Sequence, residues 1–490
     1  MKILLNTVSV AVLALGLAAC ATTPPEPVKP ADLPKEFTAP QAAGAEQPIS
    51  TDWWKSFSSP ELTDFVNQAH SGNLDIAAAA ARVYQAQAQT GTAWSTLFPN
   101  VDVTGSAQRQ GSRRYTATSS PGTFNTFGLT GGASYELDFW GLAQDNIRAA
   151  RNNARASIYA EDVVQLTTEA DVANTYFTVL ALRERVDIAR KNIEAAKRIL
   201  AITQAKVTNG VLSNLELAQQ TAQVRGEEAQ IPRLEEQERE ERYALAILLG
   251  KLPEGFDVKG TSLEGLVAPP VQPGIPATIL TRRPDVAEAE ASLIAAHANL
   301  DAARAAFLPA IGISANGGWQ ADTISNLINP SNLAWNIGAQ LVQSIFDGGR
   351  LSSQRDLAKG QEAELVASYR AAVLNALSDT ETQIGSLSSF LDQERLTTDE
   401  VANAAEAFRI SELQYREGVI DLLTVLQAQQ TLFTSQDTLV QIKLARLQSN
   451  VGLYRALGGG WTIAADADKP TRNTFIPVPD LTDLPIGVAY

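Results

Sequence analysis

The segment Phe127-Gly-Leu-Thr-Gly-Gly-Ala-Ser-Tyr-Glu-Leu-Asp-Phe139 alternates apolar or small residues with polar residues or glycine along its whole length. A period of two predicts a β-strand with one apolar and one polar face. At about 3.3 Å per residue, the run is long enough for a tilted crossing of an outer membrane, which takes about 9 to 11 residues. This segment therefore points to a strand that crosses a bilayer.

Three further segments alternate in the same way: 101–108, 311–319 and 333–341. Together the four form two predicted hairpins, with polar loops at 109–126 and 321–332. The alternative is an ordinary sheet packed on a soluble core, which would also alternate. If the strands cross a membrane, four of them cannot close a barrel, because the smallest has about eight and an open edge in lipid leaves backbone groups unpaired. Several copies of the chain are then expected to share one barrel.

The chain also repeats itself. Three glycines of the first half have counterparts 208 residues later, namely Gly141, Gly210 and Gly250 against Gly349, Gly418 and Gly458. A spacing this constant predicts a tandem duplication of one large unit.

Long helices are predicted inside each repeat. The interval from Gly141 to Gly210 contains neither glycine nor proline, and a helix of that length would reach roughly 100 Å at about 1.5 Å per residue. The interval from Gly349 to Gly418 has equal length. Each long helix is expected to turn at its glycine and to return through a second helix, with Pro232 kinking the first return. An earlier helix is expected to begin at Ser59-Pro60 and to run to about Leu97.

Apolar residues recur every seven positions in the first long helix. One row is Val179, Val186, Ile193, Leu200 and Val207, and a second row of mostly small residues is Leu182, Ala189, Ala196 and Thr203. Two rows with this spacing predict a coiled-coil seam.

Residues 1–19 resemble a secretion signal that ends before Cys20. The sequence Leu17-Ala-Ala-Cys20 has the form of a lipobox, so we expect lipid attachment at Cys20, with Ala21 directing the product to the outer membrane. The remaining boundaries predicted from the sequence are a Pro/Ala-rich tether at 20–50, a first repeat at 51–250, a linker at 251–283 that is irregular, a second repeat at 284–458, and a tail at 459–490. The linker and tail are expected to lie midway along the helices.

Composition argues against several classes of function. The formal net charge is −15, which gives a nucleic acid no electrostatic footprint. His70 and His297 are the only histidines and Cys20 is the only cysteine. We therefore expect no enzyme, no cofactor and no metal site.

Five motifs resemble the TolC-like outer membrane factors, in their OprM/NodT-like lipoprotein branch. They are Asp52-Trp-Trp-Lys-Ser-Phe57, Arg282-Arg-Pro-Asp-Val286, Ala303-Arg-Ala-Ala-Phe-Leu-Pro309, Phe346-Asp-Gly-Gly-Arg350 and Tyr415-Arg-Glu-Gly418. The resemblance covers the chain from Cys20 to about Trp461. It implies a mixed α and β membrane protein, a homotrimer with a 12-stranded outer membrane β-barrel, four strands per chain, continued by a periplasmic α-helical barrel.

The resemblance also implies a function. Such a trimer is the exit duct of a drug efflux system and works with a periplasmic adaptor and an inner-membrane pump of the resistance-nodulation-division class. The alternatives are the outer membrane component of type I protein secretion, a structural coiled-coil lipoprotein, and an enzyme held by lipid. From its physical properties, Arg282-Arg283 is expected only to precede a helix that begins at Pro284.

In such a duct, residues at the hairpin turns would converge on the axis and close it, since apolar rings exclude water and acidic rings favour cations. The candidates are Gly210, Val211, Leu212, Gly418, Val419, Ile420, Asp421 and Leu422. Asp421 is equally compatible with a helix N-terminal role. Arg409 and Arg416 are candidates for restraining neighbouring helices in the shut state, although charges on a helix are commonly solvated.

Overall fold

A computed structural model describes residues 34–39, 50–112, 122–267, 271 and 274–462. The predicted signal 1–19, Cys20, most of the tether and residues 463–490 of the tail lie outside the described residues. The described residues form two compact units, one from within 83–157 and 289–369, and the other from within 34–82, 158–288 and 370–462. Four helices contribute residues to both units: α3 (Leu74–Ser95), α4 (Leu142–Thr208), α7 (Pro284–Ala305) and α8 (Arg350–Arg416).

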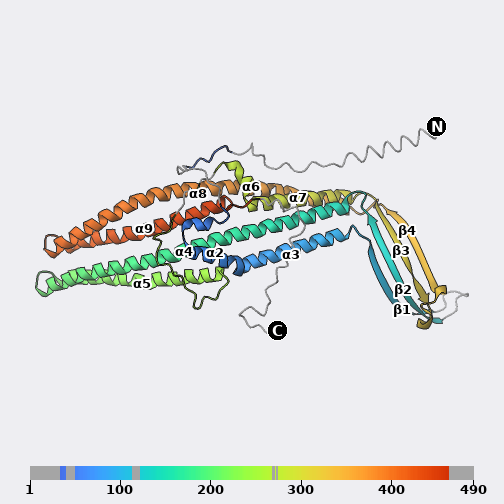
Figure 1. The fold of residues 1–490 in the computed structure, drawn as a ribbon, viewed down its shortest axis with the longest axis horizontal. Coiled ribbons are helices and arrows are strands. Elements are labelled where there is room, and N and C mark those ends of the chain that lie inside the picture. The colour runs from blue at the N-terminus through green and yellow to red at the C-terminus, as the bar shows by residue number, and fades with distance from the viewer. Residues whose placement is uncertain (1–33, 40–49, 113–121, 268–270, 272–273, 463–490) are drawn as a thin grey trace. The chain divides into compact units, whose positions relative to one another are not determined.

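The first unit contains the sheet. Strands β1 (Asn100–Ser112), β2 (Gly122–Leu137), β3 (Ala310–Ala321) and β4 (Leu333–Val342) form one antiparallel sheet in sequence order, as Figure 1 shows. All four predicted strands are confirmed. The first hairpin loop is shorter than predicted, because β1 and β2 continue pairing as far as Ser112 and Gly122. The central pairing of β2 with β3 joins the two repeats.

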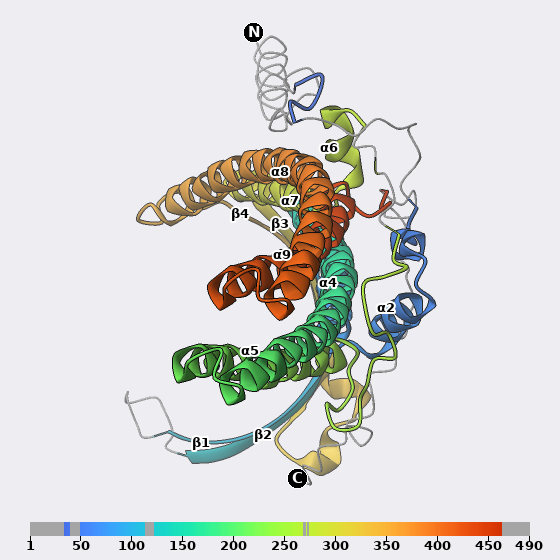
Figure 2. The same cartoon turned by 90° about the vertical axis from the view of Figure 1, so that its left-hand side faces the viewer.

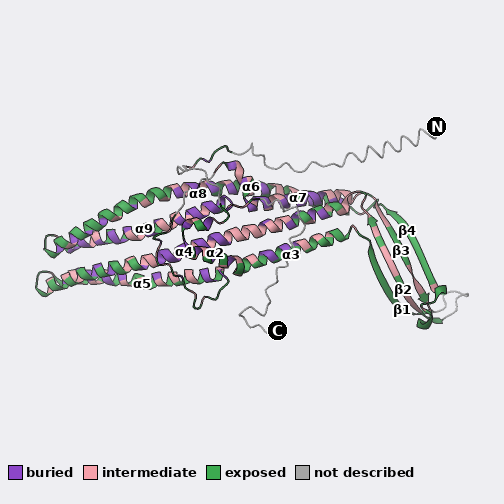
Figure 3. Cartoon of the chain, in the orientation of Figure 1, coloured by how far each residue is buried: buried purple, intermediate pink, exposed green. Residues whose placement is uncertain are grey.

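The edge strands present apolar side chains to their surroundings. All ten residues of β4 are exposed, and Figure 3 shows the strand in the colour of exposed residues. Trp335 and Ile337 of β4 are 74% and 71% exposed, and Val101 and Val103 of β1 are 72% and 74% exposed. Exposed apolar residues on an unpaired edge are unfavourable in water, so this sheet requires lipid or another chain around it.

The expected early helix is two helices, α2 (Pro60–Gly72) and α3 (Leu74–Ser95). The prediction of a single helix to Leu97 was therefore wrong at Asn73. Its backbone is extended, and its side-chain oxygen accepts hydrogen bonds from the amides of Asp75 and Ile76 while its amide group donates to the Leu248 carbonyl at 2.8 Å. Asn73 thus caps a new helix, as asparagine commonly does.

The long helices agree with the duplication. Helix α4 (Leu142–Thr208) and α8 (Arg350–Arg416) each have 67 residues, and α5 (Asn214–Leu248) and α9 (Leu422–Ala456) each have 35. In Figures 1 and 2, α4 lies beside α5 and α8 lies beside α9. Helix α5 continues through Pro232, and the kink there stays a prediction. None of the helices in the described ranges is both long and apolar enough for a membrane span.

The linker is less irregular than predicted. Residues Pro276–Thr278 form a 3-10 turn, η4, and Ile279–Arg282 form one helical turn, α6, before α7 (Pro284–Ala305) begins. The buried Arg283 donates to the Asp285 carboxylate at 2.7 Å and to the Ala456 carbonyl at 3.0 Å. Arg283 therefore has the structural role that the sequence indicated, whereas the Arg282 side chain is exposed.

The predicted seam is buried over part of its length. Val179, Val186 and Ile193 of α4 are at most 8% exposed, whereas Leu200 is only half-buried. Its neighbour Ile199 is fully buried instead. The buried face of α4 therefore departs from the predicted seven-residue row at this point.

An aromatic core lies midway along α4. A 3-10 turn, η3 (Trp53–Phe57), places Trp53 stacked on Tyr454 of α9 at 5.3 Å between ring centroids, and Phe57 packs on Phe177 of α4 at 5.2 Å. Trp461 packs edge-on against Tyr159. The segment before α2 and the described start of the tail therefore lie against α4, and for the start of the tail this position was predicted.

Candidate functional site

The second unit carries two equivalent helical hairpin tips. Gly210 joins α4 to α5 with φ +75°, and Gly418 joins α8 to α9 with φ +80°. The amide after each glycine bonds back to the helix, Val211 to the Lys206 carbonyl and Val419 to the Gln414 carbonyl, both at 2.8 Å. This is the usual way to end a helix with a left-handed glycine. Both copies of the repeat therefore make the same turn.

Side chains cap the returning helices at both tips. Ser213 and Glu216 form a reciprocal capping box at the start of α5. At the start of α9, Asp421 accepts hydrogen bonds from the Thr424 amide at 2.9 Å and the Thr424 hydroxyl at 2.6 Å. Both hydrogen bonds lower the pKa of Asp421, and the bond from the Thr424 hydroxyl has the larger effect. Asp421 is therefore a helix cap, and its membership of an acidic ring stays a prediction.

The predicted gate residues differ in how exposed their side chains are. Val211 and Val419 are 68% and 70% exposed at the two turns. Leu212 and Ile420 are partly buried against an apolar cluster, and Leu422 is a buried member of that cluster. The tip cluster consists of buried residues from α4, α8 and α9, which are Ala195, Ile199, Ala404, Phe408, Tyr415, Leu422, Val425, Leu432 and Phe433. Among these apolar candidates the two valines are the most exposed, and the gate itself stays a prediction.

The two candidate restraint residues pair within their own segments. Arg409 makes two bonds of 2.7 Å to Glu406, and Arg416 lies 3.3 Å from Glu417. All four side chains are more than half exposed. Among the described residues these arginines form no hydrogen bond or ion pair between the hairpins, and a contact with a neighbouring subunit stays a prediction.

Thr203, Lys206 and Tyr415 are among the residues that do connect the hairpins close to the tips. The hydroxyls of Thr203 on α4 and Tyr415 on α8 are 2.8 Å apart, and burial raises the pKa of Tyr415. Lys206 donates to the Tyr415 carbonyl, and its ammonium group lies 4.4 Å from the centre of the Tyr415 ring. The sequence contained one indication of a polar contact here, because Thr203 is a polar residue in the predicted seam.

Buried polar groups follow the tip cluster along the returning helices. Gln220 on α5 is fully buried and donates to the Ala196 carbonyl at 2.8 Å. Gln429 on α9 is also fully buried, and its amide has no partner among the described residues. Glu227 is 8% exposed, and burial raises the pKa of its carboxyl group. Buried polar groups weaken packing, so this region is suited to rearrangement.

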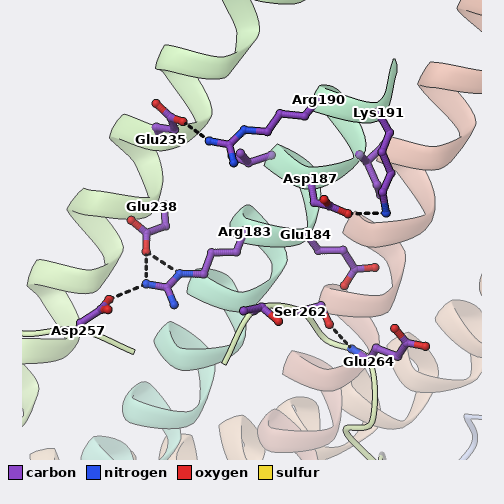
Figure 4. Close-up of a pocket in the computed structure, with 13 residues that line it drawn as sticks. Arg183, Glu184, Asp187, Arg190, Lys191, Glu235, Glu238, Asp257, Ser262 and Glu264 are labelled. Atoms are coloured by element: carbon purple, nitrogen blue, oxygen red, sulfur yellow. Dashed lines mark hydrogen bonds and ion pairs between the residues drawn. The ribbon is translucent and has the colours of Figure 1, made fainter. Parts of the chain in front are cut away.

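A charged cavity of about 800 Å³ lies farther along α4, between α5 and the linker. Figure 4 shows Arg183 reaching Glu238 of α5 and Asp257 of the linker, at 2.8 Å and 2.7 Å. Arg183 also donates to the carbonyls of Val258 and Gly260, and Arg190 pairs with Glu235 at 2.8 Å. The bonds of Arg183 therefore fasten the linker to the first hairpin. Across the described ranges, no group of three or more His, Cys, Asp or Glu could hold a metal ion.

Comparisons with known proteins agree with this architecture. The sequence profile of the family described as outer membrane efflux protein matches residues 65–251 and 275–459. The pyoverdine export outer membrane protein OpmQ of Pseudomonas aeruginosa is 38% identical over 453 residues, covering 91% of this chain and 95% of that protein. The probable efflux pump outer membrane protein TtgC of Pseudomonas putida is 31% identical, covering 93% and 96%. The solved outer-membrane channel OprN matches with a TM-score of 0.81 at 25% identity, over 90% of this chain and 99% of that one.

Proposed function

Because the chain belongs to the outer membrane efflux protein family, it is an outer membrane efflux channel, and we propose that it passes small molecules outward as the exit duct of a tripartite efflux system. A periplasmic adaptor and an inner-membrane pump supply the cargo. The proposal of small molecules over secreted proteins is supported by relatives named for pyoverdine export and for an efflux pump.

One structural observation supports the assembly of three chains into one barrel. The sheet has four strands, and β1 and β4 each pair on one side only. A bilayer does not tolerate open strand edges, so the edges of neighbouring copies pair with each other. Three copies supply 12 strands, enough for a barrel with an aqueous interior. The mass of the detergent-extracted protein tests this, together with conductance in planar bilayers, and a monomer without conductance contradicts it.

Lipid attached at Cys20 forms a second anchor beside the strands, after removal of the signal 1–19. This proposal is supported by the lipobox sequence alone. A single membrane anchor is weaker than two, yet the barrel supplies most of the insertion energy. Cys20→Ala should therefore remove the lipid seen by mass spectrometry and leave trimers in the outer membrane fraction. Loss of trimers would show that the lipid is needed for assembly.

The periplasmic gate lies at the hairpin tips. Val211 and Val419 line the constriction, while Gly210 and Gly418 permit the turns and Leu212, Ile420 and Leu422 pack behind them. The support for this gate is the exposure of the two valines beside a cluster with buried polar groups. Val419→Asp should raise the conductance of the resting channel, because a charged ring holds water where an apolar ring excludes it. Unchanged conductance would place the constriction elsewhere.

A deletion strain tests whether the channel transports small molecules or secreted proteins. Without the channel, susceptibility to antibiotics should rise and the release of exported small molecules should fall, and complementation should reverse both changes. A deletion that blocks only the secretion of a protein would favour type I secretion instead.

A further inference from the structure

One residue from each strand lies in a single row across the sheet of the first unit. Asp102 of β1 is directly opposite Gly132 of β2, Gly132 is opposite Asn316 of β3, and Asn316 is opposite Asn336 of β4. Side chains that are directly opposite in neighbouring strands lie on the same face of a sheet. Asp102, Asn316 and Asn336 therefore share one face and one level along the strands. Together with Gly132 they form a polar row that crosses all four strands.

The face that carries the polar row lines the interior of the barrel. Successive side chains of a strand point to opposite faces, so Val103 of β1 and Ile337 of β4 lie on the other face. Both are exposed apolar side chains, and strands of outer membrane barrels alternate apolar residues towards lipid with polar residues towards the lumen. In the trimer, the polar row therefore recurs three times around the lumen at one level.

The side chains of Asp102 and Asn316 meet over Gly132. A Cβ atom added to Gly132 would lie 3.0 Å from Oδ1 of Asn316, and 3.2 Å and 3.4 Å from the two carboxylate oxygens of Asp102. The Asn316 amide nitrogen donates to Oδ1 of Asn336 at 3.2 Å, and this bond turns the Asn316 oxygen towards Gly132. Three side-chain oxygens therefore border one point above a glycine.

These three oxygens are all hydrogen-bond acceptors. Within the described part of the chain, Asp102 forms no ion pair, and its hydrogen-bond partner is the Thr104 hydroxyl, at 3.4 Å from Oδ2. The Asp102 carboxylate and the Asn316 oxygen cannot bond to each other, because neither carries a hydrogen. A cation between them is attracted by the charge and takes both as ligands. Carboxylate and amide oxygens, completed by water, are ligands that Ca²⁺ accepts in proteins.

A carboxylate on this face does not by itself create such a cluster. Glu136 of β2 lies on the same face, and the residue opposite it is Gly312 of β3. The atoms nearest to a Cβ atom at Gly312 would all belong to Gln340, with its amide nitrogen at 3.5 Å. The Glu136 carboxylate therefore does not share a glycine position with a second oxygen, as Asp102 does.

We propose that Asp102 and Asn316 bind a cation that prefers oxygen ligands, with one site in each chain on the luminal wall of the barrel. Asp102 supplies the charge and two oxygens, Asn316 supplies a third oxygen, and Asn336 is a positioning residue that holds the Asn316 amide. Three such sites at one level make this part of the lumen favour cations over anions. The inference rests on the proposed trimeric duct, because only a closed barrel makes this face the wall of a pore.

Binding of Ca²⁺ to the full-length, detergent-solubilised trimer tests the proposal. Radioactive Ca²⁺ is followed by equilibrium dialysis in an excess of KCl, which screens isolated surface charges. Asp102→Asn should weaken this binding about tenfold or more, because the affinity for Ca²⁺ depends on the charge of its ligands. Glu136→Gln is the matched control, since it removes the same charge from the same face. It should bind Ca²⁺ as the wild type does.

A second pair of variants tests the space between the oxygens and leaves every charge in place. Gly132→Ala puts a methyl group at the point that the three oxygens border, and Gly132 is not in the left-handed region, so its backbone accepts alanine. This variant should weaken Ca²⁺ binding severalfold. Gly338→Ala is its control on the same face, because the nearest atom to the added Cβ would be the Ser314 hydroxyl oxygen at 4.0 Å. It should leave Ca²⁺ binding unchanged.

Equal Ca²⁺ binding by the wild type and Asp102→Asn would overturn the proposal. Equal loss in Asp102→Asn and Glu136→Gln would also overturn it, because that result would reveal only a general effect of luminal charge. Conductance of the same trimers tests the duct separately. Trimers that bind Ca²⁺ through Asp102 but do not conduct would contradict the duct and support the site. Conducting trimers whose variants all bind Ca²⁺ alike would contradict only the site.

Discussion

The side-chain oxygens of Thr203 and Tyr415 lie 2.8 Å apart although the residues are separated by 212 positions in the chain. Both side chains are buried, and Thr203 also donates to the Ile199 carbonyl at 2.9 Å. The bond joins α4 to α8 just before each helix reaches its tip. It is therefore placed to hold the two hairpins of one protomer together while the channel is closed.

Tyr415→Phe should loosen the tips without unfolding the chain. The variant removes one hydroxyl and keeps the ring, so the expected loss is about 1 kcal/mol. Single-channel recording should show more frequent opening. Tyr454→Phe is the control, because that hydroxyl contacts Ser56 at 3.3 Å in the aromatic core instead. More frequent opening in both variants would mean that the effect is not specific to the tips.

Substitutions of Asp421 separate a helix cap from an acidic ring. Asp421→Asn keeps an oxygen that can accept from the Thr424 amide, whereas Asp421→Ala keeps none. If Asp421 serves only as a helix cap, Asp421→Ala should lower thermal stability and Asp421→Asn should not. Neither variant should then change the cation selectivity of the channel. Altered selectivity in Asp421→Asn, measured from reversal potentials, would reveal the ring.

The stabilising charge of Asp421 also predicts a pH dependence. Hydrogen bonds from Thr424 lower its pKa below the ordinary value of 3.8. A depressed carboxyl pKa stabilises the fold above the unfolded value, and that contribution is lost as the pH falls through the folded pKa. The stability difference between wild type and Asp421→Ala should therefore shrink in acid below pH 3.8.

Glu227→Gln should raise thermal stability at pH 7. Burial raises the pKa of Glu227 above its ordinary value of 4.5, so the folded state favours the neutral carboxyl. The associated stability is present below pH 4.5 and is lost as the pH rises through the folded pKa. The advantage of glutamine should therefore vanish in acid. Glu228 is the control, because bonds from Arg225 and Lys197 lower its pKa, and Glu228→Gln should give no gain at pH 7.

The duplicated glycines should differ in their tolerance of alanine. A Cβ atom at Gly458 would lie 1.8 Å from the Arg282 carbonyl oxygen, whereas one at Gly418 would meet nothing within 4 Å. Gly418→Ala therefore costs only left-handed strain, about 1 to 2 kcal/mol. Gly458→Ala requires the backbone to move and should reduce the yield of folded trimers. Similar unfolding temperatures for the two variants would contradict this.

Arg183→Lys should release the linker from the first hairpin. Lysine keeps the charge but cannot reach Glu238, Asp257 and the two carbonyls with one planar group. We expect faster proteolysis within residues 251–267 and a loss of about 1 to 3 kcal/mol. Arg190→Lys, at the exposed neighbouring pair, should leave the cleavage rate unchanged.

Local patterns in the sequence were sufficient to predict the elements. Alternation predicted the four strands, and the glycine spacing predicted two long helices, which both have 67 residues. These features depend on neighbouring residues, because strand and helix periods are set by the backbone itself. The prediction of one continuous helix failed at Asn73, because the Asn73 side chain accepts hydrogen bonds from the backbone amides of Asp75 and Ile76 and so starts a new helix.

Which side chains meet was decided only by the tertiary structure. The sequence did not indicate that Leu422 is buried in the tip cluster or that Tyr415 bonds to Thr203, and it left open whether Asp421 lies at a helix start or in a gate. Along a helix of this length, the drift between 3.5 and 3.6 residues per turn accumulates and rotates the buried face. The face that each tip residue presents therefore depends on the packing of segments that lie some 200 residues apart in the chain.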